Sequence, residues 1–363
     1  MEFLAGGRAE VRITRADVGK RVSVRRLTGD GAGGPAFTDA VGVLTSWDQG
    51  VLSITRRNGE IVAVEESAMV AAKVVPDRPA ARHGGARPSS GEPSRRRGPS
   101  ATVRELQTVA ARGWPAVETA RLGEWTLRAS GGFTRRANSV LPLGDPGVPL
   151  GTALERVGQW YDARGLRPTI MVATGPDGGG AELAAELAER GWTDEAHTRI
   201  RIAALAPLAD TEVPAGSAGG AAPRVVLSRE PGADWPALYN RTGEAGLSQE
   251  AARNALRVLT GGPSVWFATV AGPDGGTAAI GRLVVDGRWA GFAAVEVAPA
   301  ARRQGLATAV MAALAERALE EGASAAYLQV EADNAGALGF YDRLGFTDHH
   351  DCHYRRALPG GRR

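Results

Sequence analysis

The sequence has a single cysteine, Cys352, among its 363 residues. One thiol cannot form an internal disulfide or a multi-cysteine zinc site. Long apolar runs are also missing. None approaches the ~20 residues that a helix needs to cross a bilayer, and the first residues contain no stretch of signal-peptide length. We therefore expect a cytoplasmic protein with no membrane partner.

Lysine is scarce as well, because only Lys20 and Lys73 occur and nearly all of the 43 basic side chains are arginine. Together with 49 glycines, this composition is typical of a GC-rich genome. The net charge of +3 is too dilute over this length to indicate a nucleic-acid surface unless the charges cluster. At ~100–200 residues per domain, the length predicts two or three domains.

Two segments have the composition of linkers. Residues 77–100 contain no aliphatic or aromatic side chain larger than alanine and are rich in Pro, Gly, Ser and Arg, so they cannot bury enough surface to offset the entropy of ordering. Six arginines against Asp77 and Glu92 give this segment a charge of +4. We expect a disordered tether. The alternative is an arm that touches RNA or an acidic partner, but it lacks the interleaved aromatic residues of a stacking platform. Residues 209–223, rich in small residues, form the second predicted linker.

Residues 1–76 alternate apolar and polar side chains with a period of two, which is typical of half-buried strands. Several short strands separated by turn signals such as Asn58-Gly59 predict a small antiparallel all-β barrel of the SH3-like type. The segment Gly29–Gly34 fits G-x-G-x-x-G, but no amphipathic helix follows it, so we predict a hairpin loop rather than a dinucleotide site. The predicted strands are Arg21–Leu27, Ala40–Thr45, Val51–Arg56 and Ile61–Val64.

Two further blocks, residues 101–208 and 224–357, mix helices and strands and contain an internal repeat. Leu187–Asp194 (LAERGWTD) resembles Tyr341–Asp348 (YDRLGFTD), with a glycine, an aromatic residue and Thr-Asp at the same places. We expect one strand–helix–strand unit, with a glycine cap and an aromatic anchor, used twice. The predicted helices are Val103–Arg112, Leu150–Arg164, Gly305–Glu321 and Ala335–Leu344, and the predicted strands are Trp125–Ala129, Thr169–Ala173, Thr198–Ala203, Trp266–Val270, Ala278–Val285, Trp289–Val297, Ala325–Val330 and His349–Arg355.

In the second of these blocks a hydrophobic strand, Phe292–Val297, runs through a tight loop into the helix that begins near Gly305. Free N–H groups and the positive end of the helix dipole converge at such a helix N-terminus, which suits a pyrophosphate. The small residues Gly305 and Ala307 let a phosphate approach the backbone, and Arg302 and Arg303 add positive charge. These residues alone predict an anionic, phosphate-bearing ligand.

The loop resembles the first signature of the GNAT superfamily of N-acetyltransferases, R/Q-x-x-G-x-G/A after the fourth strand, through Arg302-x-x-Gly305-x-Ala307. Residues 334–346 (NAGALGFYDRLGF) match the superfamily's second signature. The resemblance covers residues 224–357 and implies an α/β (α+β) fold with a mixed central sheet flanked by helices. With the repeat it implies a tandem GNAT fold, similar to that of mycothiol synthase. The N-terminal barrel resembles that of an uncharacterised bacterial GNAT group.

Residues 101–208 lack the signature residues of the other half. Counting back from Gly191, Leu187 stands at the place of Tyr341 and Gly180 at the place of Asn334. No R-x-x-G-x-A sequence occurs before the helix that should correspond. We therefore expect a degenerate GNAT-like half that braces residues 224–357, the catalytic GNAT domain.

The resemblance implies acyl transfer from acetyl-CoA as co-substrate. In that family the pantetheine lies between the fourth and fifth strands, here Trp289–Val297 and Ala325–Val330, where backbone N–H groups hold it. The pyrophosphate lies on the loop and the first turn of the next helix. The implied cofactor-binding residues are Val295, Val297, Arg302, Arg303, Gln304, Gly305, Leu306, Ala307, Thr308 and Asn334.

Tyr341 matches the family's usual general acid, which protonates the departing thiolate, although a core aromatic at helical spacing is the alternative reading. The amine must lose a proton, and a carboxylate acting through water can take it. Glu296, on the fourth strand, and Glu331, after the fifth, are the candidates, and we prefer Glu296 by its position in the family. Cys352 has no evident activating constellation beyond adjacent histidines, so we expect direct transfer in a ternary complex.

The last predicted strand reads His349-His350-Asp351-Cys352-His353, which invites a metal hypothesis. In a regular strand His349, Asp351 and His353 face one side and His350 and Cys352 the other, so they cannot all converge. We therefore expect no metal site and a strand that contributes polar residues near the acceptor pocket.

The leading hypothesis is an acetyl-CoA-dependent N-acetyltransferase acting on a small-molecule or protein amine, a mycothiol-precursor-like amine among them. A second hypothesis is an acyl-CoA sensor whose barrel and basic linker engage nucleic acid or a protein. The barrel arginines Arg21, Arg25 and Arg26 give it some support, but no RNA-binding aromatic pair accompanies them. Tyr341 favours the enzyme, because a sensor needs the phosphate loop and not the acid. The sequence leaves the acceptor and the oligomeric state open.

Overall fold

The computed structural model describes residues 11–31, 34–56, 60–75, 99–175, 180–213, 223–239, 249–273 and 275–358. The segments predicted as linkers, 77–100 and 209–223, lie largely outside these ranges, so a disordered tether stays a prediction. No helix among the described residues is long and apolar enough to cross a membrane.

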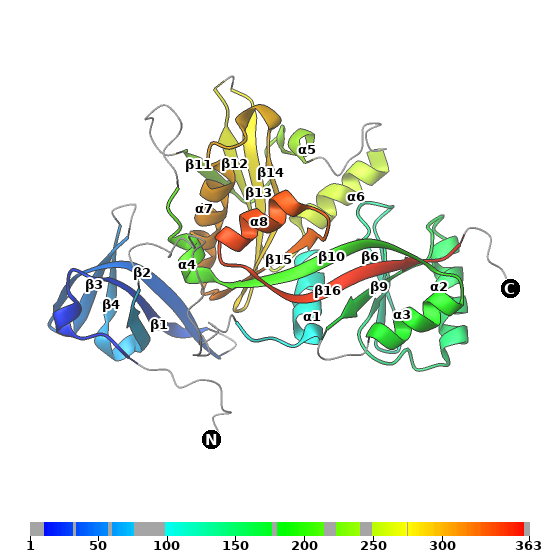
Figure 1. Cartoon of the computed structure of the whole chain (residues 1–363), viewed down its shortest axis with the longest axis horizontal. Coiled ribbons are helices and arrows are strands. Elements are labelled where there is room, and N and C mark those ends of the chain that lie inside the picture. Colours follow the sequence, from blue (N-terminus) through cyan, green and yellow to red (C-terminus); the bar gives the residue numbers. More distant parts are fainter. Residues whose placement is uncertain are drawn as a thin grey trace, which may run out of the picture.

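The N-terminal part is an all-β unit whose five antiparallel strands follow the order β4-β3-β2-β1-β5 (Figure 1). Leu52 and Ile54 are fully buried and their neighbours along the strand are not, which is the predicted alternation. Strands β1 and β2 pair as far as Gly31 opposite Gly34, as the predicted hairpin requires, while residues 32 and 33 between them lie outside the described residues. Of the five strands of this unit in the described residues only β5 was missed, because Lys73 is its one polar residue and apolar and polar side chains do not alternate along it. The strands are β1 (Arg21–Gly31), β2 (Gly34–Asp48), β3 (Val51–Thr55), β4 (Ile61–Glu65) and β5 (Met69–Val74).

This β unit packs against the C-terminal part of helix α7 (Leu306–Glu320). The buried Thr38 hydroxyl donates to the carbonyl of Leu319 at 2.5 Å, and Arg56 pairs with Glu316 at 3.4 Å. Val41 belongs to the same buried cluster as the apolar face of α7. The small barrel therefore braces the helix whose other end begins at the predicted phosphate loop.

The rest of the chain forms the two mixed halves that the sequence predicts (Figure 1). The motif-bearing strand and helices agree with the predicted bounds to within a residue or two. The elements that were not predicted are β6 (Glu118–Leu122), β8 (Leu141–Pro142), α4 (Leu205–Ala209), β11 (Val225–Ser228), α5 (Trp235–Leu238) and α6 (Gln249–Thr260). The first half comprises α1 (Val103–Gly113), β6 (Glu118–Leu122), β7 (Trp125–Ala129), β8 (Leu141–Pro142), α2 (Leu150–Asp162), β9 (Thr169–Thr174), α3 (Gly180–Glu189), β10 (Thr193–Ala204) and α4 (Leu205–Ala209). The second comprises β11 (Val225–Ser228), α5 (Trp235–Leu238), α6 (Gln249–Thr260), β12 (Ser264–Ala271), β13 (Thr277–Asp286), β14 (Trp289–Val297), α7, β15 (Ala325–Glu331), α8 (Ala335–Arg343) and β16 (Thr347–Arg356).

The two halves share one eight-stranded sheet, in the order β11-β12-β13-β14-β15-β10-β16-β9. Strand β10 of the first half lies between β15 and β16 of the second, and β16 in turn pairs with β9 of the first. In Figure 1 these two long strands, green and red, cross the molecule side by side. Each half thus completes the sheet of the other, so the boundary expected near residues 209–223 separates two parts of one continuous sheet.

The repeat explains this exchange. Equivalent residues such as Asp194 and Asp348 stand 154 positions apart, and the pairs at the two ends of the β10–β16 ladder exchange places when the two strands swap roles. Asp194 lies opposite Arg355, and Asp348 lies opposite Arg201, which is the repeat equivalent of Arg355. Both pairs are ion pairs, at 3.6 Å for Arg355 and Asp194 and 2.7 Å for Arg201 and Asp348. The halves are therefore related by a pseudo-twofold axis between β10 and β16.

Helices cover both faces of the sheet beside β13. A side chain at Gly281 would meet Val310 of α7, so this residue faces α7. The next residue, Arg282, is fully buried on the opposite face, where it donates to the carbonyls of Gly113, the last residue of α1, and Leu259 of α6. These layers hold β14 and the start of α7 in fixed positions at one end of the sheet.

Candidate active site

Strands β14 and β15 diverge after a short stretch of pairing. Their parallel ladder runs only from Trp289 opposite Ala325 to Phe292 opposite Leu328, although β14 continues to Val297. On its other side β14 stays paired with β13 as far as Val297. The backbone edge from residue 293 to residue 297 therefore has no strand opposite it within the described residues, at the place where the sequence predicted the pantetheine to lie.

A β-bulge at Ala294 causes the divergence. This residue has φ +52°, and the β13–β14 register shifts beside it, between Ile280 and Arg282. An extra residue in one strand bends that strand and increases its local twist. The bend turns β14 away from β15 and leaves Val295, Glu296 and Val297 only partly buried.

The loop after β14 forms a concave set of backbone donors. Arg303 has φ +65° and Gly305 has φ +78°, and left-handed residues in such a loop turn successive N–H groups toward one side. No N–H group of residues 303–308 has a hydrogen-bond acceptor among the described residues, and α7 begins without a side-chain cap. Such a helix N-terminus attracts anions. Arg302, Arg303 and Gln304 are exposed around it.

The first turn of α7 shows how the loop is anchored. Leu306 is buried in the core beneath the sheet, whereas Ala307 and Thr308 are partly exposed beside the donors. Arg302 also donates through Nε to the carbonyl of Val297 at 3.3 Å, which ties the loop back to the end of β14. The structure thus brings the residues predicted for the pantetheine and the pyrophosphate into one continuous backbone path.

Tyr341, on α8, lies near Glu296 of β14. Burial raises the pKa of the Tyr341 phenol to about 12, and the negative charge of Glu296 contributes in the same direction. The ring packs against Phe340 and Phe346, at 5.2 and 5.6 Å between centroids. Its hydroxyl has no hydrogen-bond partner among the described residues. A phenol with this pKa is protonated at neutral pH and is a proton donor, as the predicted acid must be.

Asn334 caps helix α8, since its side-chain oxygen accepts from the N–H of Ala337 at 3.0 Å. This capping role was not predicted. It leaves the amide N–H₂ of an exposed side chain, which has no partner among the described residues, at the N-terminus of α8, three residues after the end of β15. Glu331, the alternative base, ends β15, and its carbonyl accepts from Asn334 N–H at 3.1 Å.

Cys352 is buried, and burial raises the pKa of its thiol to about 12. Gln107 of α1 donates to its Sγ atom at 2.9 Å. A thiol in this state is not a nucleophile at neutral pH. The simple alternation expected for this strand is wrong at its start, because the β10–β16 register shifts between Ile200 and Arg201. The shift brings His349 and His350, neighbours in the sequence, to 2.7 Å between their Nδ1 atoms.

The counterparts of these residues in the first half carry no such chemistry. Leu187, at the repeat position of Tyr341, is fully buried in the apolar core of its own half. A β-carbon at Gly180, the counterpart of Asn334, would collide with the backbone of Ala173. Helix α2 begins after Pro149 without arginines before it. One half of the pair therefore has the constellation and the other does not.

Two family models match the chain. Residues 100–355 match the model described as the C-terminal region of the probable histone acetyltransferase Rv0428c, and residues 16–73 match the model of the N-terminal Sm-like domain of that protein. The first match covers both halves of the shared sheet, and the second covers the small β unit that the sequence predicted as an SH3-like barrel.

Three individual proteins are similar. The probable histone acetyltransferase Rv0428c of Mycobacterium tuberculosis is 28% identical over 345 residues, 95% of this chain and 97% of that protein. The uncharacterized N-acetyltransferase YobR of Bacillus subtilis is 27% identical over 255 residues, 70% of this chain and 98% of that protein. Among solved structures, a GCN5-related N-acetyltransferase from Kribbella flavida has a TM-score of 0.47 and 20% identity, covering 71% of this chain and 96% of that chain.

Proposed function

The chain belongs to the GNAT family of N-acetyltransferases, and from this premise we propose that it transfers an acetyl group from acetyl-CoA directly to an amine in a ternary complex. The observation that carries the proposal is the divergence of β14 from β15 directly before a loop of unpaired N–H groups. An extended chain with a pyrophosphate at one end fits that path, and acetyl-CoA has this shape.

The pyrophosphate binds the N–H groups of residues 303–308, assisted by Arg302 and Arg303. The pantetheine lies along the open edge of β14, where it pairs with the backbone as an added strand would. Asn334 donates its free amide to the CoA arm while its oxygen continues to cap α8. These contacts place the thioester carbonyl beside the N–H groups near Val297, which polarise it.

The amine nitrogen attacks the thioester carbon, and the bond from that carbon to sulfur breaks. Glu296 accepts the proton that the amine loses, through a water molecule, and Tyr341 gives its proton to the departing thiolate. Glu331 is the alternative base. The products are an amide and free CoA, and no acyl-enzyme forms, since the Cys352 thiol is buried and protonated.

The acceptor class rests on the relatives alone. The name of the Mycobacterium tuberculosis relative refers to a histone acetyltransferase, so we propose a protein lysine as the first amine to test. Small amines, mycothiol-precursor-like amines among them, are the comparison in the same assay.

Calorimetric titration of acetyl-CoA tests the cofactor. Ala307→Glu places a carboxylate in the first turn of α7, where the helix dipole favours it and the pyrophosphate does not tolerate it. We expect micromolar binding to the wild type and a loss of about 100-fold or more in the variant. Ala181→Glu, the same exchange at an exposed position in the first turn of α3, is the matched control and retains wild-type affinity.

Equal affinity of the wild type and Ala307→Glu, or no binding to the folded wild type, contradicts the proposal. Gly305 is the less suitable position for this test. Its φ of +78° strains any other residue, so a loss of binding there would not separate repulsion from distortion of the loop.

A further inference from the structure

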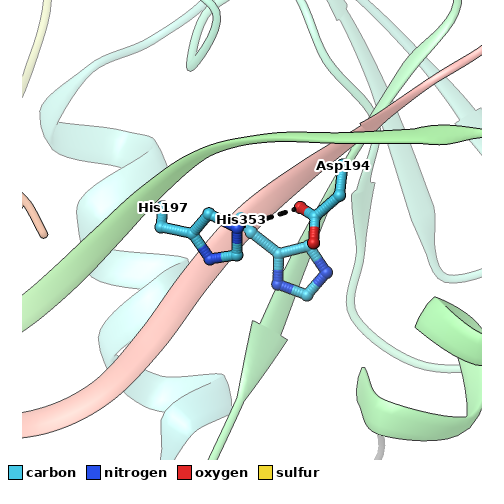
Figure 2. A group of neighbouring side chains, drawn as sticks. All are labelled: Asp194, His197 and His353. Atoms are coloured by element: carbon cyan, nitrogen blue, oxygen red, sulfur yellow. Dashed lines mark ion pairs between the residues drawn. The ribbon is translucent and has the colours of Figure 1, made fainter.

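Outside the active site, Asp194, His197 and His353 form a cluster on the two exchanged strands. Their ligand atoms all lie within 4.8 Å of one another, and His197 Nε2 lies 3.3 Å from Asp194 Oδ1 (Figure 2). The rings of His197 and His353 stack at 5.4 Å between centroids. Asp194 and His197 come from β10 and His353 comes from β16, so the set exists only because the two halves interlock.

A bulge in β10 presents His197 to this cluster. Ala196 has φ +54°, and the β10–β16 register shifts between Glu195 and Thr198. His197 is held at the bulge by its own backbone, because its carbonyl accepts from Ala332 N–H at 2.9 Å. Its imidazole is exposed, so the cluster is open to solvent on that side.

The third member, His353, is inside the protein. Its side chain is 8% exposed, and its Nε2 atom is buried without a hydrogen-bond partner among the described residues. An unpartnered buried nitrogen costs free energy unless something binds it. Burial lowers the pKa of this imidazole, and the neutral form has the lone pair that a metal ion requires.

The repeat supplies an internal comparison. In the equivalent place of the other half, Asp348 is paired with two arginines, Arg199 and Arg201, each at 2.7 Å. The counterpart of Arg199 is His353, so Asp194 has lost one of the two cationic partners. The guanidinium of Arg355, the other partner of Asp194, lies 3.6 Å from Asp194 Oδ2, farther than the arginines lie from Asp348. A neutral histidine thus occupies the place of a positive charge, which leaves Oδ1 of Asp194 available to a cation.

We propose that Asp194, His197 and His353 bind a divalent transition-metal ion, with zinc as the metal of choice. Two imidazoles and a carboxylate are a zinc ligand set, with bonds of about 2.0–2.2 Å. Tetrahedral ligands at that length are about 3.3 Å apart, which is the separation of His197 Nε2 and Asp194 Oδ1. The exposed side chains of β10 close the remaining gap to His353 by changing rotamer. Water fills the fourth position on the solvent side.

Bound zinc joins β10 to β16 beside the pseudo-twofold axis. It also fixes His197, whose carbonyl holds the segment that leads from β15 to Asn334. The metal therefore stabilises the junction of the two halves and the segment that leads from β15 to Asn334. This inference does not depend on the proposed acetyl transfer, since binding is measured without turnover.

The test is a zinc titration of the metal-free full chain against a chromophoric chelator. We expect one zinc per chain in the wild type. Asp194→Asn and His197→Gln, both exposed and near-isosteric, each weaken binding by about 100-fold or more, because even the loss of a supporting partner of a ligand costs 10–100-fold. His83→Gln, a histidine outside the described residues, is the control and leaves the affinity unchanged.

X-ray absorption of the zinc-loaded chain identifies the ligands, with two imidazoles and one carboxylate expected. A chain that binds no stoichiometric zinc overturns the proposal. So does zinc binding that survives both variants, or that is lost in His83→Gln alone. Circular dichroism of each metal-free variant confirms that it is folded, so that a loss of zinc is not a loss of structure.

Discussion

At the residue scale, the proposed chemistry depends on two side chains that come from different elements. The signature sequences identify Tyr341, and the structure adds that Glu296 is near enough for its charge to act on the Tyr341 pKa. That proximity could not be predicted, because the two residues lie 45 positions apart (341 minus 296) and come from different elements, β14 and α8. The environment of the Cys352 thiol could not be predicted from the sequence either, since it includes Gln107 of α1.

Tyr341→Phe should lower kcat by about 10²–10⁴-fold while the KM for acetyl-CoA changes little, since the variant removes only the proton donor. The fold should be retained, because the hydroxyl has no partner to lose within the described residues. Steady-state kinetics with thiol release as the readout checks the split. If Tyr341→Phe has the wild-type kcat, Tyr341 is a core residue and solvent protonates the departing thiolate.

The pH dependence of the rate follows from the Tyr341 phenol. Its pKa is raised to about 12, so the phenol stays protonated, and able to donate, as the pH rises from about 7 to about 10. In that interval the wild-type rate should rise or level off as the base and the amine lose protons, and it should not fall. A descending limb between those values that disappears in Tyr341→Phe contradicts the assignment of this pKa.

At the element scale, the bulge in β14 opens the strand edge on which we propose that the pantetheine lies. The sequence predicts the bounds of β14, Trp289–Val297, because its apolar run ends at the loop signature. It does not predict the left-handed φ of Ala294, since nothing about an alanine marks such a position. The open edge was therefore expected only from the family resemblance, and the structure supplies its physical cause.

Ala294→Val should destabilise the fold by about 1–2 kcal/mol and weaken acetyl-CoA binding, because a β-branched residue resists left-handed backbone and favours a straight strand. Ala294→Gly is the matched control, which keeps the bulge and retains affinity. Denaturant unfolding and the acetyl-CoA titration measure the two effects. Equal affinity of both variants with the wild type means that the bulge does not control the site.

At the scale of the whole molecule, the two halves share one continuous sheet. The repeat in the sequence indicates that they share a fold, and the small barrel, the two signatures and most element bounds were also predictable. The exchange of β10 and β16 was not, because a strand's own residues specify its faces but not which distant strand it pairs with. Arg201 shows how the exchanged strand contacts the other half. Its buried side chain crosses from β10 to Asp342 of α8 at 2.6 Å.

Residues 99–358 should therefore unfold in a single transition, and neither 101–208 nor 224–357 should fold alone. Without the other half, β10 loses its neighbours β15 and β16, and β16 loses its neighbours β10 and β9. Calorimetry of the full chain and circular dichroism of the two fragments check this. Two separate transitions, or a fragment with a cooperative melt, contradict the interlocked sheet as the unit of stability.

The central claim is direct acetyl transfer, and a single-turnover experiment tests it most directly. Enzyme in excess over acetyl-CoA is mixed with or without a lysine-rich protein acceptor, and CoA thiol and acetylated products are followed by rapid quench and mass spectrometry. The account predicts no thiol release without the amine, and with it thiol and acetyl-lysine that appear together in equal amounts. A burst of thiol without the amine, accompanied by acetylated enzyme, would contradict it.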